Sequence, residues 1–202
     1  MHPVGMALPM TATKFLSALK APGLTVREVG TWRTHNRNHK GLWGPVNGIM
    51  IHHTVTRGTA ATVELCRVGY EGLPGPLCHV VADKQGVLHL IGYGRTNHAG
   101  LGDTLVLNRV IRENLGTNLK PRVNDIDGNP RFYGFELINM GDGVDPWPDI
   151  QLNSVAKACA SLLSVHGWTS QSVIGHKEWQ VGKVDPKGFS MDSFRKRIDS
   201  LM

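Results

Sequence analysis

Gly48-Ile49-Met50-Ile51-His52-His53-Thr54 is the stretch of sequence that decides the fold. Its apolar run follows a glycine and is rich in β-branched residues, which predicts a short buried strand ending at polar side chains. Val173-Ile174-Gly175 repeats the pattern and leads directly into His176. Each of the two predicted strands therefore carries a histidine to its carboxyl end.

The rest of the chain predicts helices and strands in irregular alternation. Two short apolar runs around the turn at 83–86 indicate a hairpin over 78–91, and a further strand is expected at 132–138. Helices are expected at 11–21 (capped by Thr13), 59–68 (capped by Thr59 or Thr62), 103–114, from 149 onward and at 191–201. The fold class expected is α/β, a single domain with a central mixed β-sheet flanked by helices.

Composition narrows the class of protein. The 202 residues are 41% hydrophobic and 19% charged, which is typical of a globular chain. The formal net charge of +6 favours an anionic partner such as nucleic acid, a membrane surface or an acidic wall polymer. No apolar run approaches a membrane span, and Met1–Pro9 lacks a secretory signal. The three cysteines, Cys66, Cys78 and Cys159, imply no disulfide framework and are expected to be reduced.

Side chains that bind metals gather at the predicted strand ends. They are the His52-His53 pair, His176, and Asp185 nine residues after His176. Catalytic zinc sites use three protein ligands of these types and keep a fourth position open. A single histidine at a strand end is more often a hydrogen-bonded structural residue, so the combination carries the prediction of a metal site.

Four local motifs make the pattern specific. The stretches 49–54 and 175–186 resemble the two zinc motifs of the type-2 N-acetylmuramoyl-L-alanine amidases, which are related in fold to the peptidoglycan recognition proteins. Asn97-His98-Ala99-Gly100 resembles a motif of the substrate cleft in that family. Tyr133-Gly134-Phe135-Glu136-Leu137 resembles the strand that carries the catalytic acid. The motifs follow one another in the family's order.

The resemblance implies a ligand set and three further roles. One Zn²⁺ per chain would be held by His52, His176 and Asp185, with His53 the weaker candidate. The remaining assignments are Glu136 as general base, Lys183 as the cation that stabilises the tetrahedral oxyanion, and His98 as a substrate-binding residue.

Three parts of the chain depart from the family pattern. Residues 1–43 are expected to form an N-terminal arm, a short helix followed by irregular chain, packed on or leading into the zinc amidase domain at 44–202. The stretch at about 101–131 is longer than the family needs, so an inserted loop region is expected there. Some members carry a tyrosine at the metal site where this sequence has Cys78, which leaves Glu136 to act alone.

The implied reaction is zinc-dependent hydrolysis of the amide bond between N-acetylmuramic acid and L-alanine in peptidoglycan, as in phage endolysins that lyse their host. Two alternatives remain open: a non-catalytic peptidoglycan-binding protein, and a cytoplasmic amidase that recycles soluble muropeptides. Peptidoglycan is the expected partner. We expect a monomer with no membrane insertion and no nucleic-acid site, because the basic residues are not interleaved with aromatic ones. Such a chain is made in the host cytoplasm and acts on the wall after release.

Overall fold

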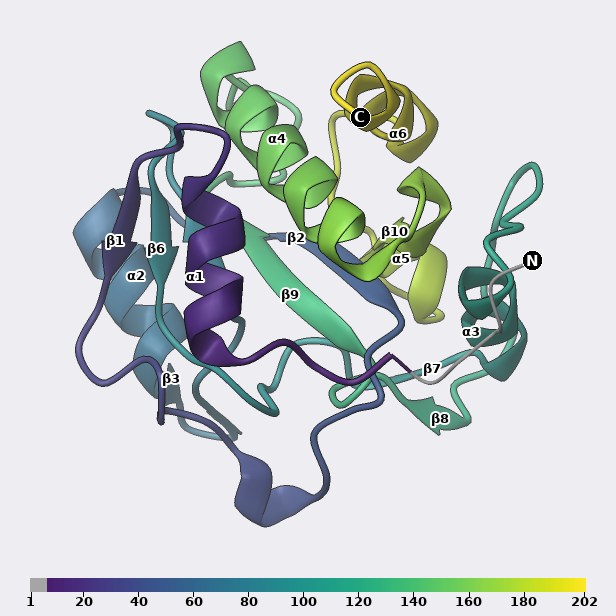
Figure 1. Ribbon diagram of the computed structural model, residues 1–202, viewed down its shortest axis with the longest axis horizontal. Helices are drawn as coiled ribbons and strands as arrows, with labels where there is room; N and C mark the ends of the chain where they lie inside the picture. Colours follow the sequence, from purple (N-terminus) through teal and green to yellow (C-terminus); the bar gives the residue numbers. More distant parts are fainter. Residues whose placement is uncertain (1–6) are drawn as a thin grey trace.

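Six strands form one mixed sheet in the computed structural model, which describes residues 7–202 (Figure 1). Their order is β1-β6-β5-β9-β2-β10, and every neighbouring pair is parallel except the hairpin of β5 and β6. The strands are β1 (Val26–Glu28), β2 (Gly48–His53), β5 (Val80–Ala82), β6 (Leu88–Leu90), β9 (Phe132–Leu137) and β10 (Val173–Gly175). The predicted fold class is confirmed.

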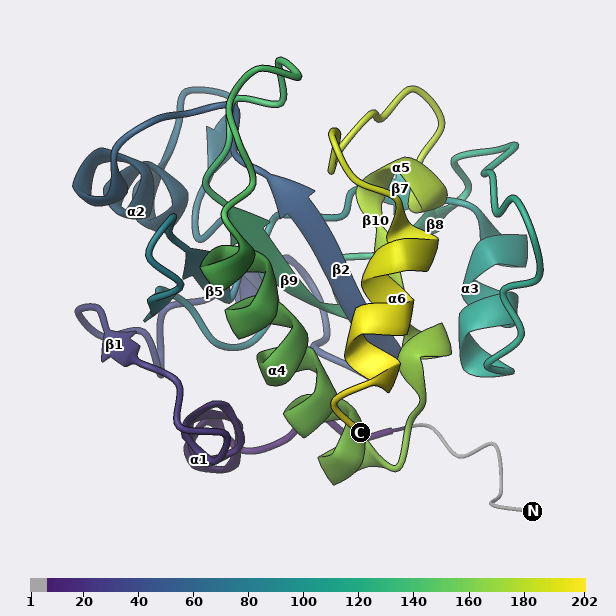
Figure 2. The same ribbon diagram turned by 90° about the horizontal axis from the view of Figure 1, so that it is seen from above.

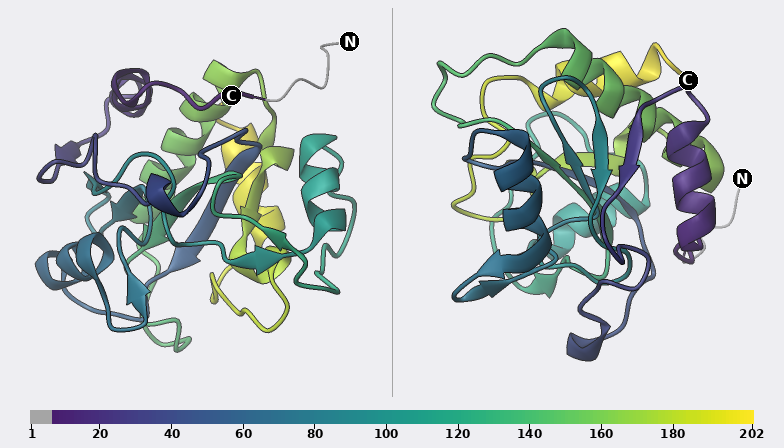
Figure 3. Two further views of the ribbon diagram at one scale, coloured as in Figure 1. Left: turned by 90° about the horizontal axis from the view of Figure 1, so that it is seen from below. Right: turned by 90° about the vertical axis from the view of Figure 1, so that its left-hand side faces the viewer.

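Helices cover both faces of this sheet (Figures 1 and 2). Helices α1, α4 and α6 pack on one face, while α2 lies on the opposite face, as the edge-on view of Figure 3 shows. The helices are α1 (Ala12–Lys20), α2 (Thr59–Val68), α3 (Thr104–Ile111), α4 (Asp149–His166), α5 (His176–Trp179) and α6 (Met191–Asp199). Short elements complete the fold: η1 (Asn38–Lys40), η2 (Ser170–Ser172), the pair β3 (Gly69–Tyr70) and β4 (Leu73–Pro74), and the pair β7 (Leu101–Gly102) and β8 (Ile126–Asp127).

Strand alternation decides which side chains reach the functional face. Ile49 and Ile51 of β2 enter the large core beneath α1, α4 and α6, whereas Met50 enters a second core beneath α3. Successive side chains of a strand point to opposite faces, so His52 lies on the face of Met50 and His53 on the face of Ile51. A third core, built around α2, occupies the same face as His52. The functional face therefore carries two separate apolar clusters.

The N-terminal segment differs from the sequence expectation in one respect. The stretch 22–43 was expected to be irregular, yet β1 pairs in parallel with β6 at the edge of the sheet, and the Trp32 side chain is buried. A strand of three residues is too short to show an alternation of apolar and polar residues in the sequence. Thr11 rather than Thr13 caps α1, and no side chain caps α2. Residues 1–6 lie outside the described part of the chain. They include the beginning of the predicted arm and most of the Met1–Pro9 stretch.

No helix within residues 7–202 is long and apolar enough to cross a membrane. All three cysteines are buried free thiols, as the sequence predicted.

A buried ion pair ties α6 to the end of β10. The guanidinium of Arg195 donates to both carboxylate oxygens of Glu178, at 2.9 and 3.0 Å, and to the carbonyl oxygen of Val173 at 3.0 Å. Glu178 in turn accepts a hydrogen bond from the backbone N–H of Gly175 at 3.0 Å. Because Glu178 belongs to the helix that begins at His176, this pair fixes the position from which that histidine projects.

Replacing Arg195 by alanine should therefore lower the free energy of unfolding by about 3–5 kcal/mol, because it leaves the Glu178 carboxylate buried without its partner. Urea denaturation measures the change. Arg67→Ala is the matched control: its ion pair with Glu64 (2.6 Å) lies on the exposed side of α2, and its loss should leave the free energy of unfolding close to the parental value. Equal losses in the two variants would contradict a structural role for the buried pair.

Candidate metal centre

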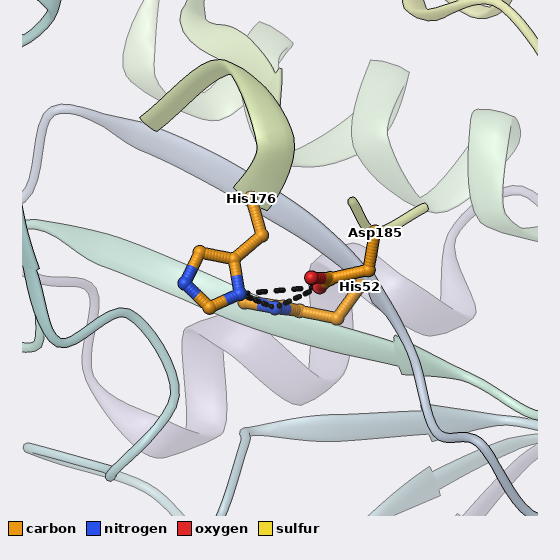
Figure 4. Close-up of side chains that lie close together, drawn as sticks. All are labelled: His52, His176 and Asp185. Carbon is orange, nitrogen blue, oxygen red and sulfur yellow. Dashed lines mark hydrogen bonds and ion pairs between the residues drawn. The ribbon is translucent and has the colours of Figure 1, made fainter. Parts of the chain in front are cut away.

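Three side chains from three separate segments meet at the carboxyl ends of β2 and β10 (Figure 4). His52 is the penultimate residue of β2, and His176 begins α5 directly after β10. Asp185 lies in the segment 180–189, which we call the strap. The Nδ1 atoms of the two histidines are 3.1 Å apart, and each is 3.1 Å from Oδ2 of Asp185. Parallel pairing of β10 with β2 brings the two histidines together, since Gly175 lies opposite Ile51.

A chain of hydrogen bonds fixes the protonation of His52. Nε2 of His98 lies 3.1 Å from the carbonyl oxygen of Phe132 and must donate to it, since a carbonyl only accepts. Burial, reinforced by the neighbouring histidines, holds the pKa of His98 well below its ordinary value, so its Nδ1 is an acceptor. Nε2 of His52 donates to that Nδ1 at 3.1 Å. Burial also lowers the pKa of His52 to about 4, which leaves the Nδ1 of His52 with a free lone pair.

The second histidine is oriented in the same way by Gln180. Nε2 of His176 lies 2.9 Å from Oε1 of Gln180 and donates to it, so in the neutral ring Nδ1 carries the lone pair. The carboxyl group of an aspartate ordinarily ionises at about pH 3.9, well below neutral pH. The aspartate is therefore an ionised acceptor.

Three acceptor atoms thus face one another at 3.1 Å, an arrangement that is repulsive unless a cation lies among them. Ligand atoms of a tetrahedral zinc with bonds of about 2.0–2.1 Å are separated by about 3.3 Å. The two imidazoles and the carboxylate are also donors that zinc prefers. The residues present therefore fit a zinc ion.

Backbone hydrogen bonds hold the strap in place. The N–H of Lys177 donates to the carbonyl oxygen of Asp185 at 2.7 Å, and the Lys177 ammonium donates to those of Pro186 and Phe189 at 2.5 and 3.1 Å. On the other face of β2, Nδ1 of His53 accepts the backbone N–H of Lys187 at 3.0 Å. Alternation along β2 thus separates the two adjacent histidines: His52 joins the cluster, and His53 anchors the strap.

Glu136 lies beside the cluster and shares a cleft of about 380 Å³ with it. It is the register partner of His52 on β9, so both side chains project from the same face of the sheet. Burial, with the nearby Cys66 and Asp185, raises the pKa of Glu136 well above its ordinary value, and its Oε2 has no hydrogen-bond partner. Lys183 and His98 also line this cleft. Both ring nitrogens of His98 are engaged within the protein, so its contact with substrate stays a prediction.

The buried Cys78 thiol belongs to the core beneath α2 rather than to the cleft wall. Its pKa is raised well above the ordinary value, mainly by burial and then by Cys66. A thiol of this kind remains protonated and gives the cleft no substitute for a tyrosine hydroxyl.

The chain is thus an α/β protein with a cleft beside a candidate metal site, and sequence comparison gives its family. The profile of the N-acetylmuramoyl-L-alanine amidases matches residues 42–188, and the chain belongs to this family. The family predicted from the sequence motifs is thereby confirmed, as is the prediction that the chain is an amidase. No curated protein sequence matches the chain.

Solved structures share the fold at low sequence identity. The endolysin amidase LysCS of Clostridium intestinale matches with a TM-score of 0.57 and 17% identity over 87% of this chain and 95% of its own. AmiA of Staphylococcus aureus, solved with its ligand, gives 0.58 and 15% over 96% and 92%. AmpDH3 of Pseudomonas aeruginosa, in complex with anhydromuramic pentapeptide, gives 0.52 and 19% over 75% and 59%.

The structure also shows supporting residues that the sequence analysis did not single out. Gln180 follows His176 by four residues, the spacing at which side chains meet on one helical face, and this signal was available in the sequence. Phe132 acts through its carbonyl oxygen, which no side-chain motif reveals. The ring of His98 packs against Gly134, where an added Cβ would come within 2.7 Å of it.

We expect His176→Ala to lose stoichiometric zinc, because one of three ligands is gone. Metal content is measured on protein purified with zinc and desalted. His39→Ala, which changes an exposed histidine, should bind like the parent. Full zinc occupancy in His176→Ala would mean that the ligand assignment is wrong.

His98→Phe tests the hydrogen-bond chain without removing a ligand. The ring volume stays, but His52 loses the acceptor that fixes its tautomer, so zinc affinity should fall about 10–100-fold. Competition with a chromogenic chelator measures the affinity, and denaturation shows whether the variant is folded. Parental affinity in a folded variant would contradict a role for His98 in orienting His52.

Proposed function

We propose that this amidase is zinc-dependent and cuts the bond between N-acetylmuramic acid and L-alanine in peptidoglycan, degrading the bacterial wall in host lysis. One observation carries the proposal: three mutually facing acceptor atoms border a cleft that also holds a buried carboxylate, Glu136, with an oxygen that has no partner. The endolysin among the similar structures supports a lytic role, and the complex of AmpDH3 with anhydromuramic pentapeptide supports the substrate.

The chain's own residues divide the chemistry among them. His52, His176 and Asp185 would hold the zinc, which when bound polarises the amide carbonyl and makes a water molecule more acidic. Glu136 accepts the proton of the attacking water and passes it to the departing nitrogen of L-alanine. A carboxylate whose pKa is raised by burial is a better base near neutral pH than an exposed one.

Two further residues assist the reaction. Lys183, exposed in the cleft wall, stabilises negative charge that develops on the amide oxygen. His98 keeps the imidazole of His52 in the tautomer that presents Nδ1. The filled ligand set together with Glu136 favours an enzyme over a recognition protein without catalysis.

Glu136→Gln tests the base. The amide keeps the shape of the side chain and the three zinc ligands but cannot take the proton, so turnover should fall about 10²–10⁴-fold. Zinc content and wall binding should stay near parental values. The rate is followed as amino groups of L-alanine released from purified walls. Release of new reducing sugars instead would contradict the assignment of the chain as an amidase.

The matched control is Glu64→Gln, which neutralises an exposed glutamate of α2 and should change the rate by a factor of about two or less. Parental turnover in zinc-loaded Glu136→Gln would move the base role to another residue.

A further inference from the structure

A second hollow, of about 730 Å³, lies against the strap. It is bordered by residues 118–121 of the long loop after α3, by the strap itself and by the start of α6. The N–H of Val181 donates to Oδ1 of Asn124 at 2.9 Å, so the strap and the long loop are in contact. Figure 2 shows both segments beside α5. We call this hollow the lysine groove, for the residues described next.

The lysine groove adjoins the metal cleft. Gly182, Lys183 and Val184 of the strap line both hollows, so a chain leaving the cleft across these residues enters the groove directly. Gln180 lines the groove and also holds the metal ligand His176. A single side chain, that of Gln180, therefore separates the groove from the candidate metal ligand His176.

Positive charge in the groove is not balanced by its own acids. Four lysines line it. The ammonium group of one of them, Lys177, donates hydrogen bonds to carbonyl oxygens of the strap. The two acids of the lining, Glu178 and Asp192, are both bound to Arg195. Lys120, Lys183 and Lys187 are exposed, and none forms an ion pair within residues 7–202. Three lysines without an ion-pair partner among the described residues thus line the groove.

The far wall of the metal cleft has the opposite character. Tyr70, Leu73, Leu77 and Val55 line it, and none of these side chains carries a charge. Tyr70 and Val55 are more than half exposed, which gives the wall an aromatic and aliphatic surface suited to an uncharged ring. The cleft therefore has an uncharged end and, across the strap, a cationic end.

The two parts of the substrate that the scissile bond joins also differ in charge. A largely uncharged glycan lies on one side of the bond, and a peptide bearing free carboxylates lies on the other. We infer that the lysine groove binds carboxylates of the stem peptide beyond L-alanine, through Lys120 and Lys187, and directs the glycan toward Tyr70. Exposed Val181 and Val184 beside these lysines suit the alkyl parts of a peptide better than a chain of phosphodiesters. This inference rests on the proposed function and adds the direction in which substrate lies.

The test compares two soluble substrates, a muramoyl pentapeptide with free carboxylates and the same compound with those carboxylates amidated. The parent should cleave the free form with the higher kcat/KM. In Lys120→Gln/Lys187→Gln the ratio of the two kcat/KM values should fall about tenfold toward one, and the change should lie mainly in KM. Lys157→Gln/Lys196→Gln removes the same charge from exposed positions outside the groove and should keep the parental ratio.

Three outcomes would overturn the inference. The first is a parent that does not distinguish the two substrates. The second is an equal fall in the control double variant, which would mean that net charge alone is responsible. The third is an unchanged ratio in Lys120→Gln/Lys187→Gln with weaker retention on walls that carry phosphate polymers, which would assign the groove to those polymers. Failure of the proposed function looks different, because the parent would then release no L-alanine amino groups from either substrate.

Discussion

The rest of the structure serves to hold three mutually repelling acceptor atoms close together. Nδ1 of His52, Nδ1 of His176 and Oδ2 of Asp185 face one another at 3.1 Å. His98 and Gln180 orient the two histidine rings through their Nε2 atoms. Parallel pairing of β2 with β9 and β10 sets the positions of the first two. A shift of one residue in either register would turn a ligand or Glu136 to the opposite face, so the sheet must be specified by the cores on both of its sides.

Much of this arrangement could be predicted from the sequence. The short apolar runs at 48–54, 132–138 and 173–175 predicted the central strands to within a residue or so of their observed ends. The order of the four motifs then indicated the family that the comparison confirmed. What the motifs could not supply was a physical reason to prefer His52 over His53, since that depends on which face of β2 meets α3 and which meets α4.

Other features depend on tertiary structure that leaves no local pattern. Strand β1 exists because its backbone meets β6, not because its residues favour extended structure. The carbonyl of Phe132 orients His98 through an atom that every residue has. The division of charge between the lysine groove and the uncharged wall arises from segments distant in the sequence, so composition showed only the total of +6.

The way in which the strap is attached has a consequence for evolution and engineering. Backbone groups make the bonds that place Asp185: its own carbonyl oxygen accepts from Lys177, and the N–H of Lys187 binds His53. The side chains of Val181, Lys183 and Val184 form no hydrogen bond within residues 7–202, so they take no part in that anchoring, although Lys183 and Val184 line both hollows. Holding the ligand and selecting what lies beside it are therefore separable tasks. A library confined to Val181 and Val184 can alter substrate preference while the ligand geometry is inherited from the backbone.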